Sequence, residues 1–172
     1  MSDKPLRVVP LDYAYDRSTF KSGSEPLDTY FKERVTQDIR RRITACFVAL
    51  SADGRIAGYY TLASASVFLG DLPAEFIKKL PRYPSIPAVR MGRLAIDQAF
   101  KGQGLGAALL ADALTRIVRS EIAAYALVVD AKDEKAASFY RHHGFLQIAT
   151  KPLTLFLPLA TVPISPLKRR RK

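Results

Sequence analysis

The spacing of apolar residues predicts an amphipathic helix in the first quarter of the chain. Within residues 24–42, Leu27, Phe31, Val35 and Ile39 recur at every fourth position, which places their side chains on one face of a helix. Basic residues occupy the remaining faces of this segment. We therefore expect the apolar face to pack on the core and the basic faces to meet solvent.

Runs rich in β-branched and aromatic residues predict a sheet. Asp53 and Gly54 separate two of these runs and are typical of a tight hairpin turn. The run at 125–130 is apolar almost throughout, as in a strand that is buried on both faces. The predicted strands are residues 7–11, 45–51, 55–68, 91–97, 125–130, 145–150 and 154–159.

Prolines interrupt the pattern between the third and fourth predicted strands. A short helix is expected at residues 72–80, with the sequence LPAEFIKKL. Pro81, Pro84 and Pro87 follow it. Because proline disfavours helical backbone in the residue before it, these positions predict an extended loop.

Two further helices are predicted in the second half of the chain. The first spans residues 104–119 and carries apolar residues at positions spaced by three and four. In the second, Asp133 is expected to cap the first turn, and the helix runs to His143 before Gly144 ends it. Antiparallel strands early and alternating strands and helices late predict a mixed α/β fold, that is, an α+β arrangement around one mixed sheet.

Length and composition are those of one globular domain. The chain has 172 residues, of which 48% are hydrophobic and 25% charged. We expect a single domain at residues 1–166 and a basic tail at 167–172. The lone cysteine, Cys46, excludes an intramolecular disulfide and a cysteine-based zinc cluster, and no metal site is predicted. With no secretory signal and no unbroken apolar span, we expect a cytoplasmic protein without a membrane contact.

The charge balance is the unusual part of the composition. Lys and Arg number 27 against 16 Asp and Glu, a formal net charge of +11. Such an excess favours polyanionic partners and accelerates their encounter with the protein. Nucleic acid, an anionic membrane surface and a phosphate-rich cofactor all satisfy it, and so does a basic surface that only meets solvent.

A glycine-rich turn carries the clearest chemical signal. Gly102, Gly104 and Gly106 lie between the strand at 91–97 and the helix that follows. Glycines let a backbone approach a ligand closely, and the first amides of a helix have no partners within it, so this junction favours a phosphate. The spacing differs from that of the P-loop and of the dinucleotide fingerprint, and a plain strand-to-helix turn also fits it.

The residues of this turn resemble the acyl-CoA site of the GNAT acetyltransferases. That family has Arg/Gln-x-x-Gly-x-Gly/Ala at this place, and Lys101 stands where Arg or Gln is usual. More narrowly, the chain is similar to the GNAT toxins of bacterial toxin–antitoxin modules. The segments that carry this similarity are GYYTLASASV at 58–67, LPRYPSIPAVRMGRLAID at 80–97, KGQGLGAALLADAL at 101–114, VVDAKDEKAASFYRHHGF at 128–145 and the closing Leu-Phe-Leu-Pro.

The resemblance implies a function and a set of site residues. An enzyme of this kind transfers acetyl from acetyl-CoA to the free α-amino group of aminoacyl-tRNA and so blocks translation. Tyr140 would act as the general acid that protonates the departing thiolate. No residue pattern predicts a general base. The residues expected to bind acetyl-CoA are Leu94, Ala95 and Ile96 along the pantetheine arm, and Lys101, Gly102, Gln103, Gly104, Leu105 and Gly106 at the pyrophosphate.

The sequence also suggests binding partners for the protein and leaves alternative functions open. The candidate tRNA contacts are Arg40, Arg41, Arg42, Arg82, Arg90 and Arg93. By the same resemblance we expect a ribbon-helix-helix antitoxin as partner, and homodimers are common in such proteins. Two other functions stay open: acetylation of a protein or small-molecule amine, and a basic binding module without turnover. The sequence does not identify the preferred aminoacyl-tRNA.

Overall fold

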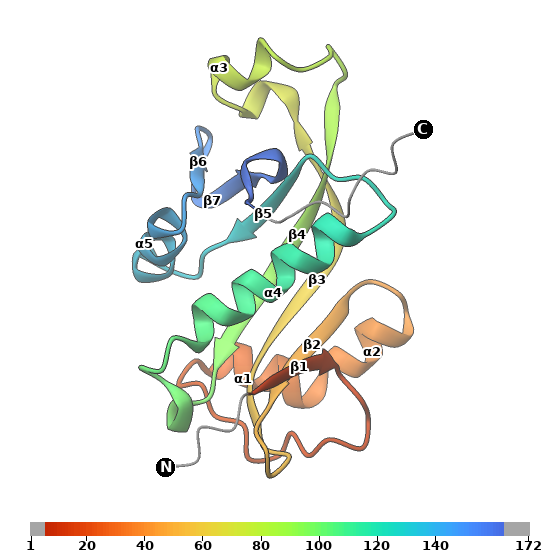
Figure 1. Ribbon diagram of the computed structural model, residues 1–172, viewed down its shortest axis with the longest axis vertical. Coiled ribbons are helices and arrows are strands. Elements are labelled where there is room, and N and C mark those ends of the chain that lie inside the picture. Colours follow the sequence, from red (N-terminus) through yellow and green to blue (C-terminus); the bar gives the residue numbers. More distant parts are fainter. Residues whose placement is uncertain (1–5, 164–172) are drawn as a thin grey trace.

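A seven-stranded mixed sheet organises the chain, in agreement with the predicted fold class. The computed structural model describes residues 6–163, and the basic tail expected at 167–172 lies outside them. The strands are ordered β1-β2-β3-β4-β5-β7-β6 (Figure 1). They are β1 (Arg7–Pro10), β2 (Ala45–Leu50), β3 (Ile56–Phe68), β4 (Ser85–Ile96), β5 (Ala126–Asp130), β6 (Leu146–Ile148) and β7 (Lys151–Pro158).

Helices cover both faces of this sheet. They are α1 (Glu25–Glu33), α2 (Val35–Arg40), α3 (Ala74–Ile77), α4 (Leu105–Arg119) and α5 (Glu134–His142). The neighbouring residues Tyr59 and Tyr60 point to opposite faces, since Tyr59 packs with α1 and α2 and Tyr60 packs with α4. No helix among residues 6–163 is long and apolar enough to cross a membrane.

The strands β4 and β5 are parallel, whereas the other paired strands of the described sheet are antiparallel. The helix α4 makes the crossover between them. The two strands pair only from Ala88↔Ala126 to Met91↔Val129, although β4 continues to Ile96. Beyond Met91 they diverge, and this opening positions the site described below.

The predicted helix at 24–42 is wrong in one respect, because the chain forms two helices rather than one. Arg34 has φ −123° and separates α1 from α2. Phe31 and Val35, on either side of this break, are nevertheless both fully buried. A repeat of four residues is preserved across such a break, so it identifies the buried face but not the continuity of the helix.

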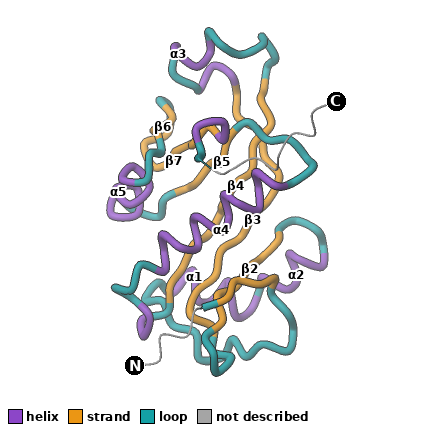
Figure 2. Tube along the Cα trace, in the orientation of Figure 1, coloured by secondary structure: helices purple, strands orange, loops and turns teal. Residues whose placement is uncertain are grey.

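The proline-rich segment also departs from its prediction as a loop. The strand β4 begins at Ser85, six residues before the predicted start, and contains Pro87. Proline is tolerated here because the Pro87 carbonyl accepts a hydrogen bond from the Tyr125 amide at 2.8 Å, which needs no N–H from proline. The preceding helix is only the single turn α3. Figure 2 shows α3 and its connecting segments beyond the end of the sheet, where β3 and β4 run on as a two-stranded ribbon.

A polar network holds α4 on the sheet. The Tyr60 hydroxyl donates to the Asp112 carboxylate at 2.5 Å, and Arg116 donates to the same carboxylate at 2.8 Å and to the Val8 carbonyl at 3.1 Å. Tyr60 is fully buried, and this burial, with the hydrogen bond to Asp112, raises the pKa of its phenol. Asp112 is therefore the shared acceptor that joins α4 to β3, and the Arg116 that it orients joins α4 to β1.

We expect Asp112→Ala to lower the free energy of unfolding by about 1–3 kcal/mol, because it leaves the buried Tyr60 hydroxyl without its acceptor. Chemical denaturation measures this loss. Glu121→Ala, at an exposed position after α4, is the control and should change little. A loss at Asp112 no larger than the control's would show that the network does not stabilise the fold.

Candidate active site

The glycine-rich turn leads directly into α4. Gly102 and Gly104 have φ of +79° and +76°, a region that residues with a Cβ rarely adopt. Gly104 is the residue that caps α4, so the free amides of the first helical turn follow it. Asp97 fixes the entry to the turn, because its carboxylate accepts hydrogen bonds from the amides of Ala99 and Lys21. The turn that presents the backbone amides is thus held by Asp97 before it and by α4 after it.

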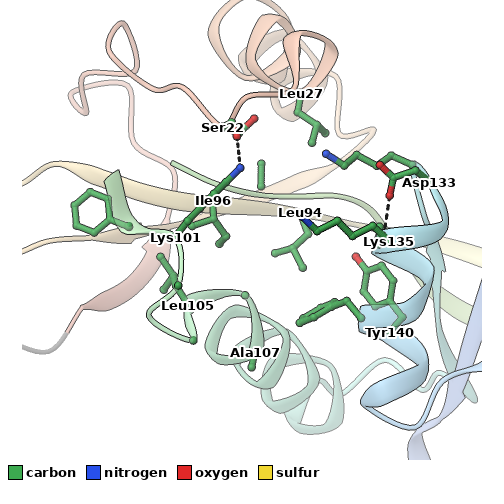
Figure 3. A pocket seen from close by; sticks show the side chains of 18 residues that line it. Ser22, Leu27, Leu94, Ile96, Lys101, Leu105, Ala107, Asp133, Lys135 and Tyr140 are labelled. Carbon is green, nitrogen blue, oxygen red and sulfur yellow. Dashed lines mark hydrogen bonds between the residues drawn. The ribbon is translucent and has the colours of Figure 1, made fainter. Parts of the chain in front are cut away.

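A cavity of about 550 Å³ lies beside this turn. Figure 3 shows it between the end of β4, the start of α4 and α5. Its walls include these predicted coenzyme-binding residues: Leu94, Ala95, Ile96, Lys101, Gly102, Gly104, Leu105 and Gly106. Gln103 belongs to the same turn but is exposed and does not line the cavity. The structure therefore brings the predicted residues together with the exception of this one side chain.

The open edge of β4 forms one wall of the cavity. Leu94, Ala95 and Ile96 pair with β3 on one side, whereas β5 reaches only as far as Met91 on the other. Backbone amides and carbonyls on that second edge can bind an extended ligand in the manner of an added strand. With apolar side chains in the walls and helix amides at one end, the cavity suits an elongated molecule that carries amide groups and a diphosphate.

Lys101 makes a contact that the sequence did not suggest. Its ammonium donates to the Ser22 carbonyl at 2.6 Å (Figure 3). Ser22 is held in turn by the Asp28 carboxylate, which accepts hydrogen bonds from its amide and its hydroxyl. Lys101 therefore joins the segment before α1 to the glycine turn. Its role as a counter-charge for a pyrophosphate stays a prediction.

Tyr140 lies at the point where β4 and β5 separate. Its ring extends from α5 into the cavity (Figure 3), and the residue is only 6% exposed. The nearest polar partner of its hydroxyl is the Met91 sulfur at 3.9 Å, a weak acceptor. Burial raises the pKa of this phenol, and the negative charge of Asp130 raises it further. Tyr140 is therefore held as a protonated donor without a strong acceptor in the described part of the chain.

Asp133 positions the helix that carries Tyr140, as predicted. Its carboxylate accepts a hydrogen bond from the Ala136 amide at 2.8 Å at the start of α5. Gly144, with φ +91°, follows the other end. The cysteine is not part of the site: Cys46 is buried in β2, and this burial raises the pKa of its thiol to about 12.

A second cavity, of about 870 Å³, lies between α1 and the ends of β4 and β5. Its charged lining residues are four cations and two carboxylates, a net positive set: Arg34, Arg90, Arg93 and Lys132 with Glu25 and Asp130. It shares Leu27 and Lys132 with the first cavity, so the two are neighbours. Two predicted tRNA contacts, Arg90 and Arg93, thus lie beside the site of Tyr140.

Sequence reasoning missed Arg34 and Lys132. Lys132 follows the buried strand β5, and residues after such a strand gather at one edge of a sheet. This signal could have identified it. Arg34 reaches the cavity from the break between α1 and α2, which the periodicity does not reveal.

The other predicted tRNA contacts do not line this cavity. Arg40 is the last residue of α2, and Arg41 and Arg42 follow it at exposed positions. Arg82 is exposed in the segment between α3 and β4. The structure therefore separates the six predicted arginines into a pair in the cavity and four on other surfaces.

Comparisons with known proteins identify the class of protein that this site defines. The acetyltransferase (GNAT) domain matches residues 18–154, and the chain belongs to this family. It is accordingly an acetyltransferase. Among individual proteins, it is 36% identical over 155 residues to the tRNA-acetylating toxin of Mycobacterium tuberculosis, covering 89% of this chain and 90% of that one.

Further relatives agree with this assignment. The chain is 30% identical to the probable toxin TacT of Sinorhizobium fredii, over 90% of this chain and 92% of that one. The crystal structure of a tyrosine-to-phenylalanine mutant of KacT superposes with a TM-score of 0.86 at 33% identity, covering 91% and 96% of the two chains. The structure of AtaT complexed with acetyl-methionyl-tRNAfMet superposes with a TM-score of 0.84 at 32% identity, with the same coverage.

The environment of Tyr140 leads to a spectroscopic prediction. Because its pKa is raised above the ordinary value of about 10, the phenol should stay protonated at pH 10 in the folded protein. Tyrosinate absorbance of the wild type and Tyr140→Phe should therefore coincide up to that pH. In urea, where every tyrosine is exposed, the two should differ by one phenol that titrates near pH 10. A difference of one phenol below pH 10 in the folded protein would contradict the raised pKa.

Proposed function

We propose that this protein transfers acetyl from acetyl-CoA to the free α-amino group of aminoacyl-tRNA and acts as a toxin by blocking translation. The observation that carries the proposal is a pair of neighbouring cavities that share Leu27 and Lys132, the first of which contains Tyr140. The first has apolar walls and helix amides, and the second is lined by four cations and two carboxylates. The names of the relatives, a tRNA-acetylating toxin and AtaT with acetyl-methionyl-tRNAfMet, support the same substrate.

The first cavity would bind acetyl-CoA. In this proposal the β4 edge at Leu94, Ala95 and Ile96 pairs with the pantetheine amides, and the amides of the glycine turn bind the pyrophosphate. The exposed Gln103 would contribute its backbone rather than its side chain. AtaT has been solved together with acetyl-CoA, which supports this assignment.

Acetyl-CoA would supply its acetyl group as a thioester. The α-amine nitrogen forms a bond with the thioester carbonyl carbon, and the carbon–sulfur bond breaks. Tyr140 donates its proton to the departing sulfur and recovers one from solvent, while the proton lost by the new amide nitrogen goes to water. The raised pKa keeps the phenol protonated at neutral pH, so its O–H can donate a hydrogen bond to the sulfur as negative charge develops there, and it passes on its proton as one returns from solvent.

The second cavity would bind the aminoacyl end of the tRNA. Arg93, Arg34 and Lys132 supply positive charge next to the first cavity, where a phosphate-bearing acceptor has to approach, while Arg90 is paired with Asp130. The exposed Arg40, Arg41, Arg42 and Arg82 would contact more distant phosphates of the same RNA. This division assigns the terminal nucleotides to the cavity and the body of the tRNA to the surface.

We further infer the biological setting from the resemblance to toxins. An antitoxin would be the partner, since AtaT is solved with the C-terminus of the antitoxin AtaR, and we propose that it is of the ribbon-helix-helix type. We also propose a homodimer in the cytoplasm. Residues 1–166 would form one domain, with the basic tail at 167–172 as an additional RNA contact.

The central test is acetylation of charged tRNA by the purified protein. With acetyl-CoA and a mixture of aminoacyl-tRNAs, we expect N-acetylated aminoacyl-tRNA as the product. Tyr140→Phe should lower the rate at least about 100-fold, the usual contribution of a general acid, while acetyl-CoA still binds. If no charged tRNA is acetylated, the proposed substrate is wrong, and acetylation of added protein or amine would then identify another acceptor.

The glycine turn provides a test of the coenzyme site. Gly104→Ala places a Cβ at φ +76°, which costs about 1–2 kcal/mol of strain, so we expect the turn to move and the affinity for coenzyme A to fall about tenfold. Titration calorimetry measures this change. Gly70→Ala is the control, because a Cβ there has no neighbour within 4 Å and no positive φ to strain. Equal affinities of the two variants would argue against the assignment of the turn.

A further inference from the structure

We propose that Arg93 is the residue that binds the 3′-terminal phosphodiester of the acceptor, through the N–H groups at the edge of its guanidinium. This inference rests on the proposed function and adds a defined role for one side chain. It concerns recognition of the substrate rather than the acetyl transfer itself.

The Tyr30 ring lies directly against this guanidinium. The Arg93 carbon Cζ lies 3.3 Å from the centroid of the Tyr30 ring, within the range of a cation–π contact. Tyr30 is only 6% exposed, and its hydroxyl donates to the Asp38 carboxylate at 2.7 Å across the break between α1 and α2. Because the ring is held at both its face and its tip, Arg93 is oriented before any ligand arrives.

The N–H groups of the same guanidinium have no acceptor in the described part of the chain. Within residues 6–163, Arg93 makes no side-chain hydrogen bond and no ion pair, although it lines the second cavity. Arg90, on the same strand, differs because Asp130 forms an ion pair with it. Arg93 is thus a planar donor whose face is occupied by Tyr30 and whose N–H groups are available in the cavity. A phosphate with two oxygens in one plane matches such a donor.

The position of the second cavity indicates which phosphate of the acceptor Arg93 would bind. It adjoins the cavity of Tyr140 at Leu27 and Lys132, so an acceptor amine that reaches Tyr140 brings the atoms nearest to it into the second cavity. In aminoacyl-tRNA, the anion closest to the α-amine is the phosphate of the last nucleotide. Asp130 is paired with Arg90, and Arg34 and Lys132 together outweigh the remaining carboxylate, Glu25, so the cavity keeps a net positive charge that favours this polyanion.

The test compares Arg93→Ala and Arg93→Lys on two acceptors, aminoacyl-tRNA and an aminoacyl-nucleoside that has no phosphate. For tRNA, we expect Arg93→Ala to lower kcat/KM at least about tenfold, mainly through KM, and to reduce the salt dependence by about 0.7 in log–log slope, the value for one phosphate contact. Arg93→Lys should restore the slope but not the affinity, because it keeps the charge and loses the planar donor. With the nucleoside, both variants should equal the wild type.

Two controls separate the possible outcomes. Arg119→Ala removes an exposed arginine at the end of α4 and should leave both acceptors unaffected. The affinity for acetyl-CoA should be the same in the wild type and all variants. Equal losses on tRNA and nucleoside would overturn the inference, because Arg93 would then shape the site rather than bind phosphate. Unchanged tRNA kinetics together with weaker binding of an acidic peptide would also overturn it and would assign Arg93 to a protein partner.

The proposed function can fail separately. In that case the wild type itself acetylates no charged tRNA, whereas failure of the inference leaves the wild type active and changes only the pattern among the Arg93 variants.

Discussion

The divergence of two parallel strands is the constraint on which this site depends. While β4 and β5 pair, from Ala88 to Met91, their backbone groups satisfy each other and no ligand can enter. Past Met91, β4 keeps β3 on one side and presents the edge at Leu94–Ile96 on the other. An unpaired strand edge invites association with another chain unless it is covered. Here the helices α4 and α5 flank the edge, so it faces a cavity of limited size instead of open solvent.

The segment before α1 joins the two cavities into one site. Its backbone is attached to the glycine turn by three hydrogen bonds, from Lys21 to Asp97, from Gln98 to Lys21 and from Lys101 to Ser22. The helix α1 begins immediately afterwards and forms a wall of the second cavity. A few short contacts therefore connect the glycine turn to the wall of the second cavity. Contacts of this kind fix the positions of the two cavities relative to each other, and fixed positions favour transfer between two bound substrates.

Sequence reasoning was successful where the signal is local. Nearby residues were enough to predict three features: the capping of α5 by Asp133, the glycine turn before α4 and the buried strand β5. It failed where distant segments decide the outcome. Lys101 meets Ser22 across 79 positions, and Pro87 fits in a strand because Tyr125 donates to its carbonyl. Periodicity and composition carry no information on either contact.

The net charge of this protein affects how fast polyanions approach, whereas local contacts decide which side chains can bind them. A charge of +11 accelerates the approach of any polyanion, but it does not distinguish one arginine from another. The structure distinguishes them by their neighbours. Arg90 is paired with Asp130, whereas Arg93 lies over the Tyr30 ring, and no acceptor within residues 6–163 bonds its N–H groups. The same reasoning applies to the tyrosines. The Tyr30 and Tyr60 hydroxyls donate to carboxylates, whereas among the described residues the Tyr140 hydroxyl has only the Met91 sulfur as a polar partner. A buried donor without a strong acceptor, in the cavity that adjoins the one lined by Arg93, is the one that a substrate can use.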